Sequence, residues 1–308
     1  MFGQKRYRSL NSHLRSRFGQ KVFKIPLDAG FSCPNRDGTY SREGCYFCST
    51  RGSGDFAGDR TMSVAEQFAY GTQMMNKKWE GKQYIAYLQA FTNTYAPVTY
   101  LRTLYDEVLQ LPGVVGLAIA TRPDCLSNEV IDLLDELNHK TYLWVEVGLQ
   151  TIHERTGKSM NLHYDYEIFL KSLAKLQGRD IETCAHLILG LPGENRAMML
   201  ESGVEVGRQS IQGLKIHLLH VMKGTPLEKW YQNGRVEFLS KEEYIDLTCS
   251  ILERIPSEIV IHRLTGDSPR SLLIGPHWSL NKWEVLNGID EELQHRNTWQ
   301  GKLYGKGK

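Results

Sequence analysis

The chain alternates short apolar runs with longer helical patterns, and this alternation limits its possible folds more than any other feature. Several of the runs are apolar almost without interruption, which is typical of strands in a parallel sheet buried on both faces. The six candidate strands are Val22–Leu27, Tyr84–Phe91, Val114–Thr121, Tyr142–Leu149, Ile181–Leu189 and Leu214–Val221. Strands that alternate with helices in this way indicate right-handed βαβ units, in an open doubly wound sheet or in a full or partial barrel.

Helix start signals follow several of these runs. Ser63 and Glu66 have the spacing of a capping box, and Ser127 is placed to cap a second helix. Apolar residues at helical spacing predict further helices at Val98–Leu109, Tyr164–Leu176 and Glu194–Gln209.

The pattern changes after Gly234. A helix is predicted at about Lys241–Arg254, and it is followed by the apolar run Ile259–Ile261 and a tail that contains several tryptophans. We interpret residues 235–308 as a C-terminal extension that supplies a candidate seventh strand and a candidate cover for part of the barrel rim.

Composition narrows the class of protein. The 308 residues suffice for one large α/β barrel or two ordinary domains, and 41% hydrophobic with 23% charged residues is typical of a soluble globular protein. The chain shows neither a secretory signal pattern nor a run of membrane-spanning length. Six cysteines, three of them close together, favour a reducing compartment; the scattered Cys125, Cys184 and Cys249 are expected to be small buried hydrophobes. We therefore predict a cytoplasmic protein with no membrane contact.

Positive charge is concentrated at the N-terminus. Residues 1–24 contain seven Lys and Arg residues and no acidic residue, with Tyr7, Phe18 and Phe23 among them. Basic side chains mixed with aromatic ones are typical of surfaces that contact nucleic acid. The alternative is a solvated basic helix whose aromatic residues pack on the domain. We treat residues 1–20 as a distinct basic segment.

Polar and glycine-rich segments follow the candidate strands. Because ligands bind at the carboxyl ends of the strands in parallel sheets and barrels, these segments are expected to meet at one rim. The segments are the cysteine loop 33–48, Thr92–Thr94, Arg122–Asp124, Gln150, Gly190–Glu194 and Lys223–Thr225. We therefore place the chemistry at this rim.

Three cysteines follow the first candidate strand. Cys33, Cys45 and Cys48 have the spacing C-x11-C-x2-C in a loop rich in glycine and polar residues. Thiolate is the soft ligand that iron–sulfur clusters and zinc both favour. Structural zinc normally takes four protein ligands, so a zinc site would need a distant side chain such as His13. A four-iron cluster on three cysteines would instead leave one iron open to a small molecule. The spacing alone leaves both alternatives open.

Taken in order, the cysteine loop and the strand-end motifs resemble the radical S-adenosylmethionine (SAM) superfamily. The resemblance is to the branch with widely spaced first and second cysteines, which includes Elongator-type tRNA-modifying enzymes and coproporphyrinogen-oxidase-like proteins. Within that branch the chain most resembles YtqA/YhcC-type bacterial proteins. The resemblance covers residues 22–227, and Gln89–Pro97 and His262–Asp267 extend it almost to full length.

The resemblance implies a fold and a reaction. It implies an α/β fold with a partial (β/α)6 TIM barrel of the radical SAM type over residues 21–234, and a [4Fe–4S] cluster held by Cys33, Cys45 and Cys48. The open iron would bind SAM, and an electron from a donor such as flavodoxin or ferredoxin would cleave the cofactor to a 5′-deoxyadenosyl radical. That radical abstracts hydrogen from a substrate.

The resemblance also implies a set of cofactor contacts. They are Phe47, Thr92, Asn93, Thr94, Arg122, Glu146, Gln150, Lys158, His186, Gly190 and His220, with His217 as a further candidate. Thr92–Thr94 stands where the family has Gly-Gly-Glu, and His186 stands where coproporphyrinogen-type members have Asp. Glu146 has an alternative as a core carboxylate paired with Lys or Arg. We favour a functional role, because an unpaired acid in so apolar a strand would be costly.

The leading functional hypothesis is a radical SAM enzyme that acts on tRNA. It depends on the resemblance, on the basic N-terminal segment and on a barrel mouth suited to a splayed-out nucleotide. The resemblance implies a sharper version, in which the 5-carboxymethylaminomethyl group of wobble uridine becomes 5-aminomethyl. The alternatives are a radical SAM enzyme that acts on a small molecule or peptide, and a non-enzymatic zinc or iron–sulfur regulator.

Overall fold

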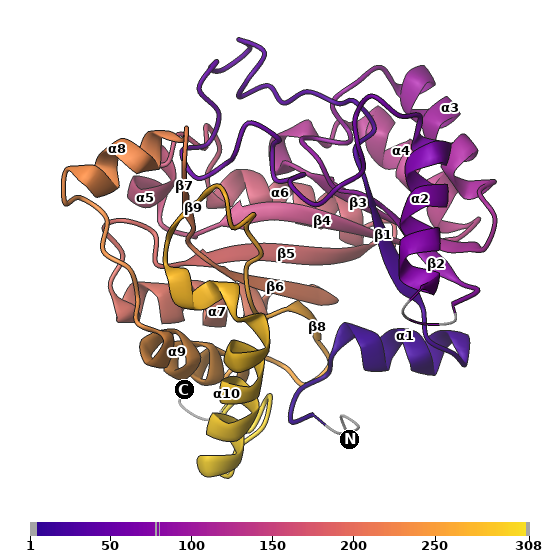
Figure 1. The fold of residues 1–308 in the computed structure, drawn as a ribbon. Helices are drawn as coiled ribbons and strands as arrows, with labels where there is room; N and C mark the ends of the chain where they lie inside the picture. The colour runs from indigo at the N-terminus through magenta and orange to yellow at the C-terminus, as the bar shows by residue number, and fades with distance from the viewer. Residues whose placement is uncertain (1–4, 78, 80, 306–308) are drawn as a thin grey trace.

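The computed structural model describes residues 5–77, 79 and 81–305. Seven parallel strands form one curved sheet in the order β1-β2-β3-β4-β5-β6-β8, an open half-barrel (Figure 1). The strands are β1 Phe23–Leu27, β2 Tyr84–Leu88, β3 Val114–Thr121, β4 Tyr142–Gln150, β5 Glu182–Leu189, β6 Gly213–Leu218 and β8 Val260–Arg263. The predicted partial barrel is confirmed, and the run near Ile259 supplies the seventh strand.

The helices are α1 Leu10–Phe18, α2 Val64–Asn76, α3 Val98–Leu109, α4 Asn128–Asn138, α5 Glu154–Ser159, α6 Tyr166–Gln177, α7 Arg196–Arg208, α8 Pro226–Gln232, α9 Lys241–Leu252 and α10 Lys282–His295, with 3-10 turns at Pro123–Cys125 and His277–Leu280. The predicted helices are present as α2, α3, α4, α6, α7 and α9, and the structure adds α1, α5, α8 and α10. The capping box of α2 is formed, because the Ser63 hydroxyl accepts a hydrogen bond from the Glu66 amide and the Glu66 side chain accepts one from the Ser63 amide. Ser127 caps α4 through the Val130 amide.

The sixth apolar run is divided between two sheets, so the prediction of one strand continuing through Val221 is wrong. β6 ends at Leu218, and the chain then turns out of the main sheet. The next two residues in extended conformation form β7, Val221–Met222, which pairs antiparallel with β9, Leu273–Gly275. Hydropathy did not mark the break, because the residues on both sides of it are buried.

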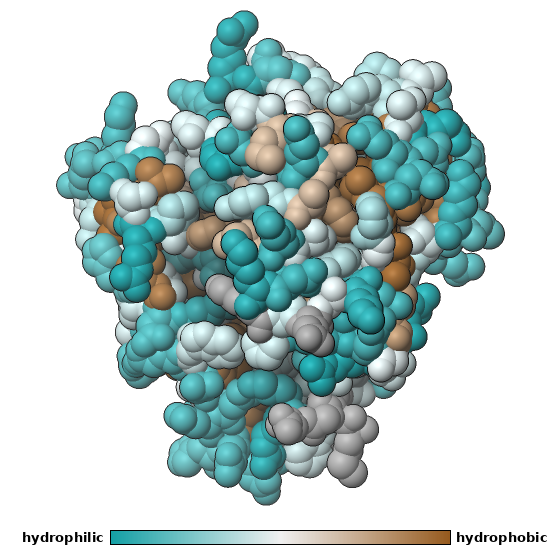
Figure 2. Space-filling view, turned by 45° about the vertical axis from the view of Figure 1, so that its right-hand side comes forward, coloured by the Kyte–Doolittle hydropathy of each residue, from teal (hydrophilic) through white to brown (hydrophobic). Residues whose placement is uncertain are grey.

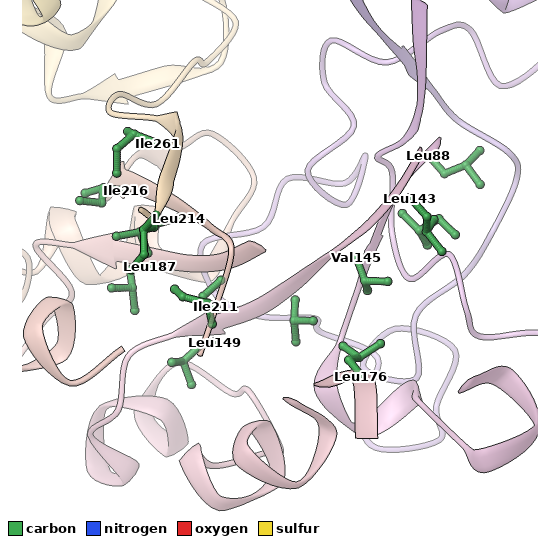
Figure 3. Packing of buried hydrophobic residues seen from close by; sticks show 14 of the residues in the cluster. Leu88, Leu143, Val145, Leu149, Leu176, Leu187, Ile211, Leu214, Ile216 and Ile261 are labelled. Atoms are coloured by element: carbon green, nitrogen blue, oxygen red, sulfur yellow. The ribbon is translucent and has the colours of Figure 1, made fainter. Parts of the chain in front are cut away.

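One hydrophobic core joins the half-barrel and the C-terminal extension. Figure 3 shows Leu143 and Leu187 of the central strands together with Leu214 of β6 and Ile261 of β8. The two edge residues are register partners, since Leu214 of β6 lies opposite Ile261 of β8. Burying a side chain of this size stabilises the fold by roughly 1.5–3 kcal/mol relative to exposure. Residues 235–308 therefore contribute to the same core as the barrel.

The basic N-terminal segment packs against the amino ends of the strands. Ser9 forms a parallel bridge with Ile261, and the α1 residue Leu14 is only 3% exposed. The Arg17 guanidinium lies 4.0 Å from the ring centroid of Tyr142, the first residue of β4. Figure 1 shows α1 at the end of the sheet opposite the long loop that follows β1. Of the two interpretations of this segment, the structure shows the packed one for residues 5–20, and residues 1–4 lie outside the described part of the chain.

The face of the molecule drawn in Figure 2 is mainly hydrophilic. Figure 2 shows a face on which polar side chains predominate and apolar ones lie in small separate patches. Among the described residues, no helix has both the length and the hydrophobicity needed to cross a bilayer.

Candidate active site

A cavity of about 470 Å³ opens at the carboxyl ends of the strands and continues between them. Its outer part is lined by the cysteine loop and by the segment after β2, and its inner part by side chains of β1, β2, β4, β5, β6 and β8. The inward side chains alternate with outward ones that face the helices, as the pleat of a strand requires. The volume lies within the usual range of small-molecule sites.

The three cysteines all line this cavity. Cys45 and Cys48 are joined by a tight turn in which the Cys48 amide donates to the Cys45 carbonyl (2.9 Å). Gly44 precedes them with φ 75°, a conformation that glycine adopts without steric cost. Arg36 fixes the far side of the loop by donating to the carbonyls of Cys48 (3.0 Å) and Ser49 (2.7 Å).

The electrostatic environment favours thiolate in this loop. A hydrogen bond from the Cys45 thiol, with the nearby Arg36 guanidinium, lowers the pKa of Cys48 to about 7. The same hydrogen bond and burial raise the pKa of Cys45, whose sulfur also accepts from Asn35 Nδ2 (3.4 Å). The loop therefore holds one thiolate readily at neutral pH, and a bound metal would draw the second proton off.

The donor set fits an iron–sulfur cluster better than a single metal ion. Within the described residues, no three His, Cys, Asp or Glu side chains gather tightly enough for one ion. A cubane places each thiolate on a different iron, so its three cysteines need only to face one space, as Cys33, Cys45 and Cys48 do. The fourth zinc ligand considered above, His13, lies on α1 with Nε2 3.0 Å from the Tyr142 hydroxyl, at the opposite end of the sheet.

The other cysteines are not part of this loop. Cys184 and Cys249 are buried in the protein interior, as expected, and burial raises the pKa of both thiols. Cys125 is half-buried rather than buried, and its sulfur lies 3.8 Å from Asp124 Oδ1.

Seven of the eleven expected cofactor contacts line the cavity. They are Phe47, Thr92, Arg122, Glu146, Gln150, His186 and His220. The further candidate His217 lines it as well. The fold thus brings side chains from the loops and from strands β4 to β6 to one space, although they are spread from position 47 to position 220 of the sequence.

The structure places the other four expected contacts away from the cavity lining. Asn93 Nδ2 donates to the Ala120 carbonyl (2.9 Å), and the Thr94 hydroxyl donates to the Cys125 carbonyl (2.6 Å), so both connect neighbouring loops. Gly190, with φ 88°, lies beside Leu219, and its amide donates to a methionine sulfur. The Lys158 side chain is 77% exposed and pairs with Glu154 on the surface of α5.

Arg122 reaches the cavity but is largely committed to other groups. Its guanidinium donates to both oxygens of Asp124 (2.9 and 2.8 Å) and to the Leu162 carbonyl (2.9 Å). Burial alone would lower the pKa of Arg122, but the hydrogen bonds and the charge of Asp124 raise it overall. Arg122 therefore stays cationic and supplies a fixed positive charge beside the cysteines.

Several buried polar atoms of the cavity have no protein partner. They are Gln150 Oε1, His186 Nε2, His217 Nε2 and His262 Nδ1. Gln150 also has a backbone φ of 73°, a conformation that residues other than glycine rarely adopt. Leaving such a group unsatisfied costs about 1–3 kcal/mol, so these atoms mark where a ligand would form hydrogen bonds.

Glu146 is the centre of a buried charge cluster in the inner part of the cavity. Lys24 Nζ lies 3.0 Å from Glu146 Oε1, and Lys215 Nζ pairs with Glu146 Oε2. Lys215 Nζ also lies 3.0 Å from the Tyr87 hydroxyl, and His262 Nδ1 lies 3.9 Å from Glu146. Burial would raise the pKa of Glu146, but attraction to Lys215 and Lys24 holds it well below the usual range. Glu146 is therefore paired, contrary to the assumption on which its functional role was favoured.

The sequence analysis did not single out Lys24, Lys215 or Tyr87. A signal was present, because each lysine interrupts a short apolar strand at an inward position, as Glu146 does. The strand pattern alone could not show that the three charges face one another, since they come from β1, β4 and β6.

The half-barrel and the three-cysteine loop at its rim define the class of protein. Residues 37–202 match the model of the radical SAM superfamily, and residues 211–295 match that of the radical SAM C-terminal domain. The chain belongs to the radical SAM superfamily.

Two relatives are similar over almost their whole length. YtqA of Bacillus subtilis (strain 168) is 54% identical over 301 residues, which covers 98% of this chain and 94% of the relative. YhcC of Escherichia coli (strain K12) is 36% identical over 304 residues, which covers 98% and 97%. Elongator complex protein 3 of Homo sapiens is 25% identical, over 65% of this chain and 37% of the relative.

Solved structures share the fold. Archaeal Elp3 of Methanocaldococcus infernus superposes with a TM-score of 0.68 at 15% identity, covering 91% of this chain and 64% of that one. Methylornithine synthase superposes with a TM-score of 0.55 at 11% identity, covering 94% and 86%. Membership of the superfamily implies a [4Fe–4S] cluster and SAM, and the cavity offers the thiols and the unpaired polar atoms that they need.

Proposed function

We propose that this chain is a radical SAM enzyme that modifies tRNA at wobble uridine, converting the 5-carboxymethylaminomethyl group to 5-aminomethyl. Cys33, Cys45 and Cys48 would hold the cluster, and Phe47 and Gln150 would line the cofactor side of the cavity. When bound, the cluster supplies the electron that cleaves SAM to a 5′-deoxyadenosyl radical. Flavodoxin or ferredoxin is the class of donor proposed for that electron.

The observation that carries the RNA part is an exposed aromatic ring at the cavity mouth. Phe56 lines the cavity and is 53% exposed, in the loop that follows the cysteines. Nearby, the Arg60 guanidinium lies 4.6 Å from the ring centroid of Phe91, which also lines the cavity. Aromatic and arginine surfaces of this kind stack on splayed-out bases in single-stranded RNA. The resemblance to Elongator-type enzymes gives independent support.

The N-terminal segment gives no support at the cavity mouth. Its helix α1 packs at the amino ends of the strands, so its basic side chains are remote from the cysteine loop. The RNA proposal therefore depends on the cavity and on the resemblance.

Nucleoside analysis of tRNA tests this proposal. A strain that lacks the gene is expected to accumulate 5-carboxymethylaminomethyluridine and to lose 5-aminomethyluridine and nucleosides made from it, as measured by mass spectrometry. Complementation with the wild-type chain should restore the parental pattern, and complementation with Cys45→Ala should not. An unchanged nucleoside pattern in the deletion strain would reject tRNA and favour a small molecule or peptide as the substrate.

A further inference from the structure

We propose that the inner end of the cavity binds a carboxylate of the substrate, held by Lys215 and Lys24. The proposal deepens the function proposed above and rests on it in one respect, since the carboxymethylaminomethyl group would supply that carboxylate. The residues and contacts that carry it belong to the barrel interior rather than to the loop that holds the cysteines.

The inner end of the cavity carries more positive than negative charge. Lys24 and Lys215 share a single carboxylate, that of Glu146, which is 4% exposed. Arg263 and Lys282 likewise share Asp267, and both Arg263 and Asp267 line the cavity. Lys282 does not line the cavity and its side chain is 43% exposed, so the lining here places three cations, those of Lys24, Lys215 and Arg263, against two carboxylates. His186, His217 and His262 add no charge, because burial lowers the pKa of each of them.

This excess of positive charge is partly buried, since the Lys24 and Arg263 side chains are 23% and 25% exposed, and an anion that balances it would be favourable. Lys24 shows this electrostatic cost, because burial lowers the pKa of its ammonium group to about 8 despite the attraction of Glu146. A carboxylate bound against Lys215 would give each lysine its own anion. Lys215 already lies within hydrogen-bond distance of Tyr87 at the cavity wall, and that hydroxyl is a second polar group for the same ligand.

Two unpartnered donors or acceptors lie beside this charge. His186 and His217 are on adjacent strands with ring centroids 4.2 Å apart, and the Nε2 atom of each is buried without a protein partner. His186 is the register partner of Lys215, so the pair stands next to the lysine. A neutral imidazole can donate or accept at Nε2, which suits a polar group adjoining the carboxylate.

The position of the cluster separates it from the cofactor region. Lys215 is the third of six residues in β6 and Glu146 the fifth of nine in β4, so both lie within the barrel. The cysteines lie on the loop beyond the end of β1. A substrate anchored by its carboxylate at the inner end would therefore extend toward the cysteines, with the bond to be changed between the two.

Small probes test the site without requiring tRNA. N-methylglycine, its uncharged amide and inorganic phosphate are added to the reconstituted holoenzyme, and the Tm is measured by calorimetry. N-methylglycine is expected to raise the Tm of the wild type in a saturable way, the amide to leave it unchanged, and Lys215→Gln to abolish the effect. Stabilisation by phosphate but not by N-methylglycine would overturn the carboxylate assignment, as would equal stabilisation by the acid and the amide.

Kinetics with tRNA from the deletion strain provide the second test. Lys215→Gln leaves Glu146 paired with Lys24, so the variant is expected to fold. Its KM for tRNA should rise at least about tenfold, which is the change in affinity expected from losing one charged hydrogen bond. Lys215→Arg should return KM most of the way to the wild-type value. Lys24→Gln should shift KM in the same direction. A loss of SAM affinity in place of the KM effect would assign the lysine to the cofactor and overturn the proposal.

The two tests distinguish the two proposals. If N-methylglycine binds as expected but tRNA is not modified, the carboxylate site stands and the tRNA function fails. If tRNA is modified and Lys215→Gln changes neither KM nor the effect of N-methylglycine, the function stands and the site is rejected.

Discussion

Buried polar groups that contact α1 and buried polar groups that line the cavity differ in their hydrogen bonding. At the amino end, the Tyr142 hydroxyl donates to Glu182 (2.8 Å) and contacts His13 of α1, so the polar atoms satisfy one another. At the carboxyl end, Gln150, the last residue of β4, presents a buried polar atom that has no protein partner. The comparison indicates that the amino end is built for stability, whereas the carboxyl end is left incomplete for ligands, as in other barrels with parallel strands.

The charge cluster around Glu146 lies between these two ends. Like the polar groups beside α1, its charged groups pair with one another, since Lys24 and Lys215 both contact Glu146. Like the cavity mouth, it has a group left to bind a ligand, because two lysines share one carboxylate. The expected effect of a substitution therefore depends on its position. Substitutions in the cysteine loop should abolish activity, and substitutions near α1 should lower the free energy of unfolding.

The largest effect is expected at the cysteine loop. Cys45→Ala should abolish both the brown colour of the anaerobically reconstituted protein and the reductive cleavage of SAM, because two thiolates cannot hold the cluster. Iron and sulfide content, visible absorption and 5′-deoxyadenosine formation measure the loss. The matched control is Cys249→Ala, whose thiol is buried on α9 away from the cavity. A Cys45→Ala protein that retains a full cluster would contradict the assignment of the cysteine loop as the cluster site.

A large loss of stability is expected at the charge cluster. Glu146→Gln leaves two lysines without their shared carboxylate, and breaking a buried ion pair in this way costs about 3–5 kcal/mol. Urea unfolding of the apo-protein at neutral pH measures the difference.

The pH dependence sharpens that prediction. Because the pKa of Glu146 is depressed in the folded protein, its contribution is present above the pKa of the unfolded chain, about 4.3, and is lost as the pH falls toward the folded value. The stability gap between wild type and Glu146→Gln should therefore narrow below about pH 4.3. A gap that stays constant from pH 7 to pH 3 would show that the ionised carboxylate is not the source of the effect.

A smaller effect is expected at α1. Leu14→Ala should lower the free energy of unfolding by about 2–3 kcal/mol, because the side chain is 3% exposed among the residues that close the amino end. SAM cleavage per folded molecule should stay unchanged, which equilibrium unfolding and a 5′-deoxyadenosine assay on the same preparation would show. Loss of cleavage at unchanged stability would mean that the amino end takes part in the chemistry.

Local signals in the sequence predicted most of the framework. The helix at Val98–Leu109 has the predicted bounds, and Ser63 and Ser127 cap the helices they were expected to cap. These features depend on residues three or four positions apart, so a short window contains all that decides them. The cysteine spacing extends over 16 residues within one loop, and it identified the three thiols that share the cavity.

Long-range packing decided what the local signals left open. Lys24 and Glu146 are 122 residues apart, and only the register of the parallel strands places them and Lys215 around one point. The position of α1 was undecided for the same reason, because its basic and aromatic side chains suit either RNA or the amino ends of the strands. The sequence by itself therefore determined most of the strands, the helix caps and the cysteine loop. Tertiary structure decided which charges are paired and which polar atoms remain free, because pairing is a property of residues that meet only when the sheet forms.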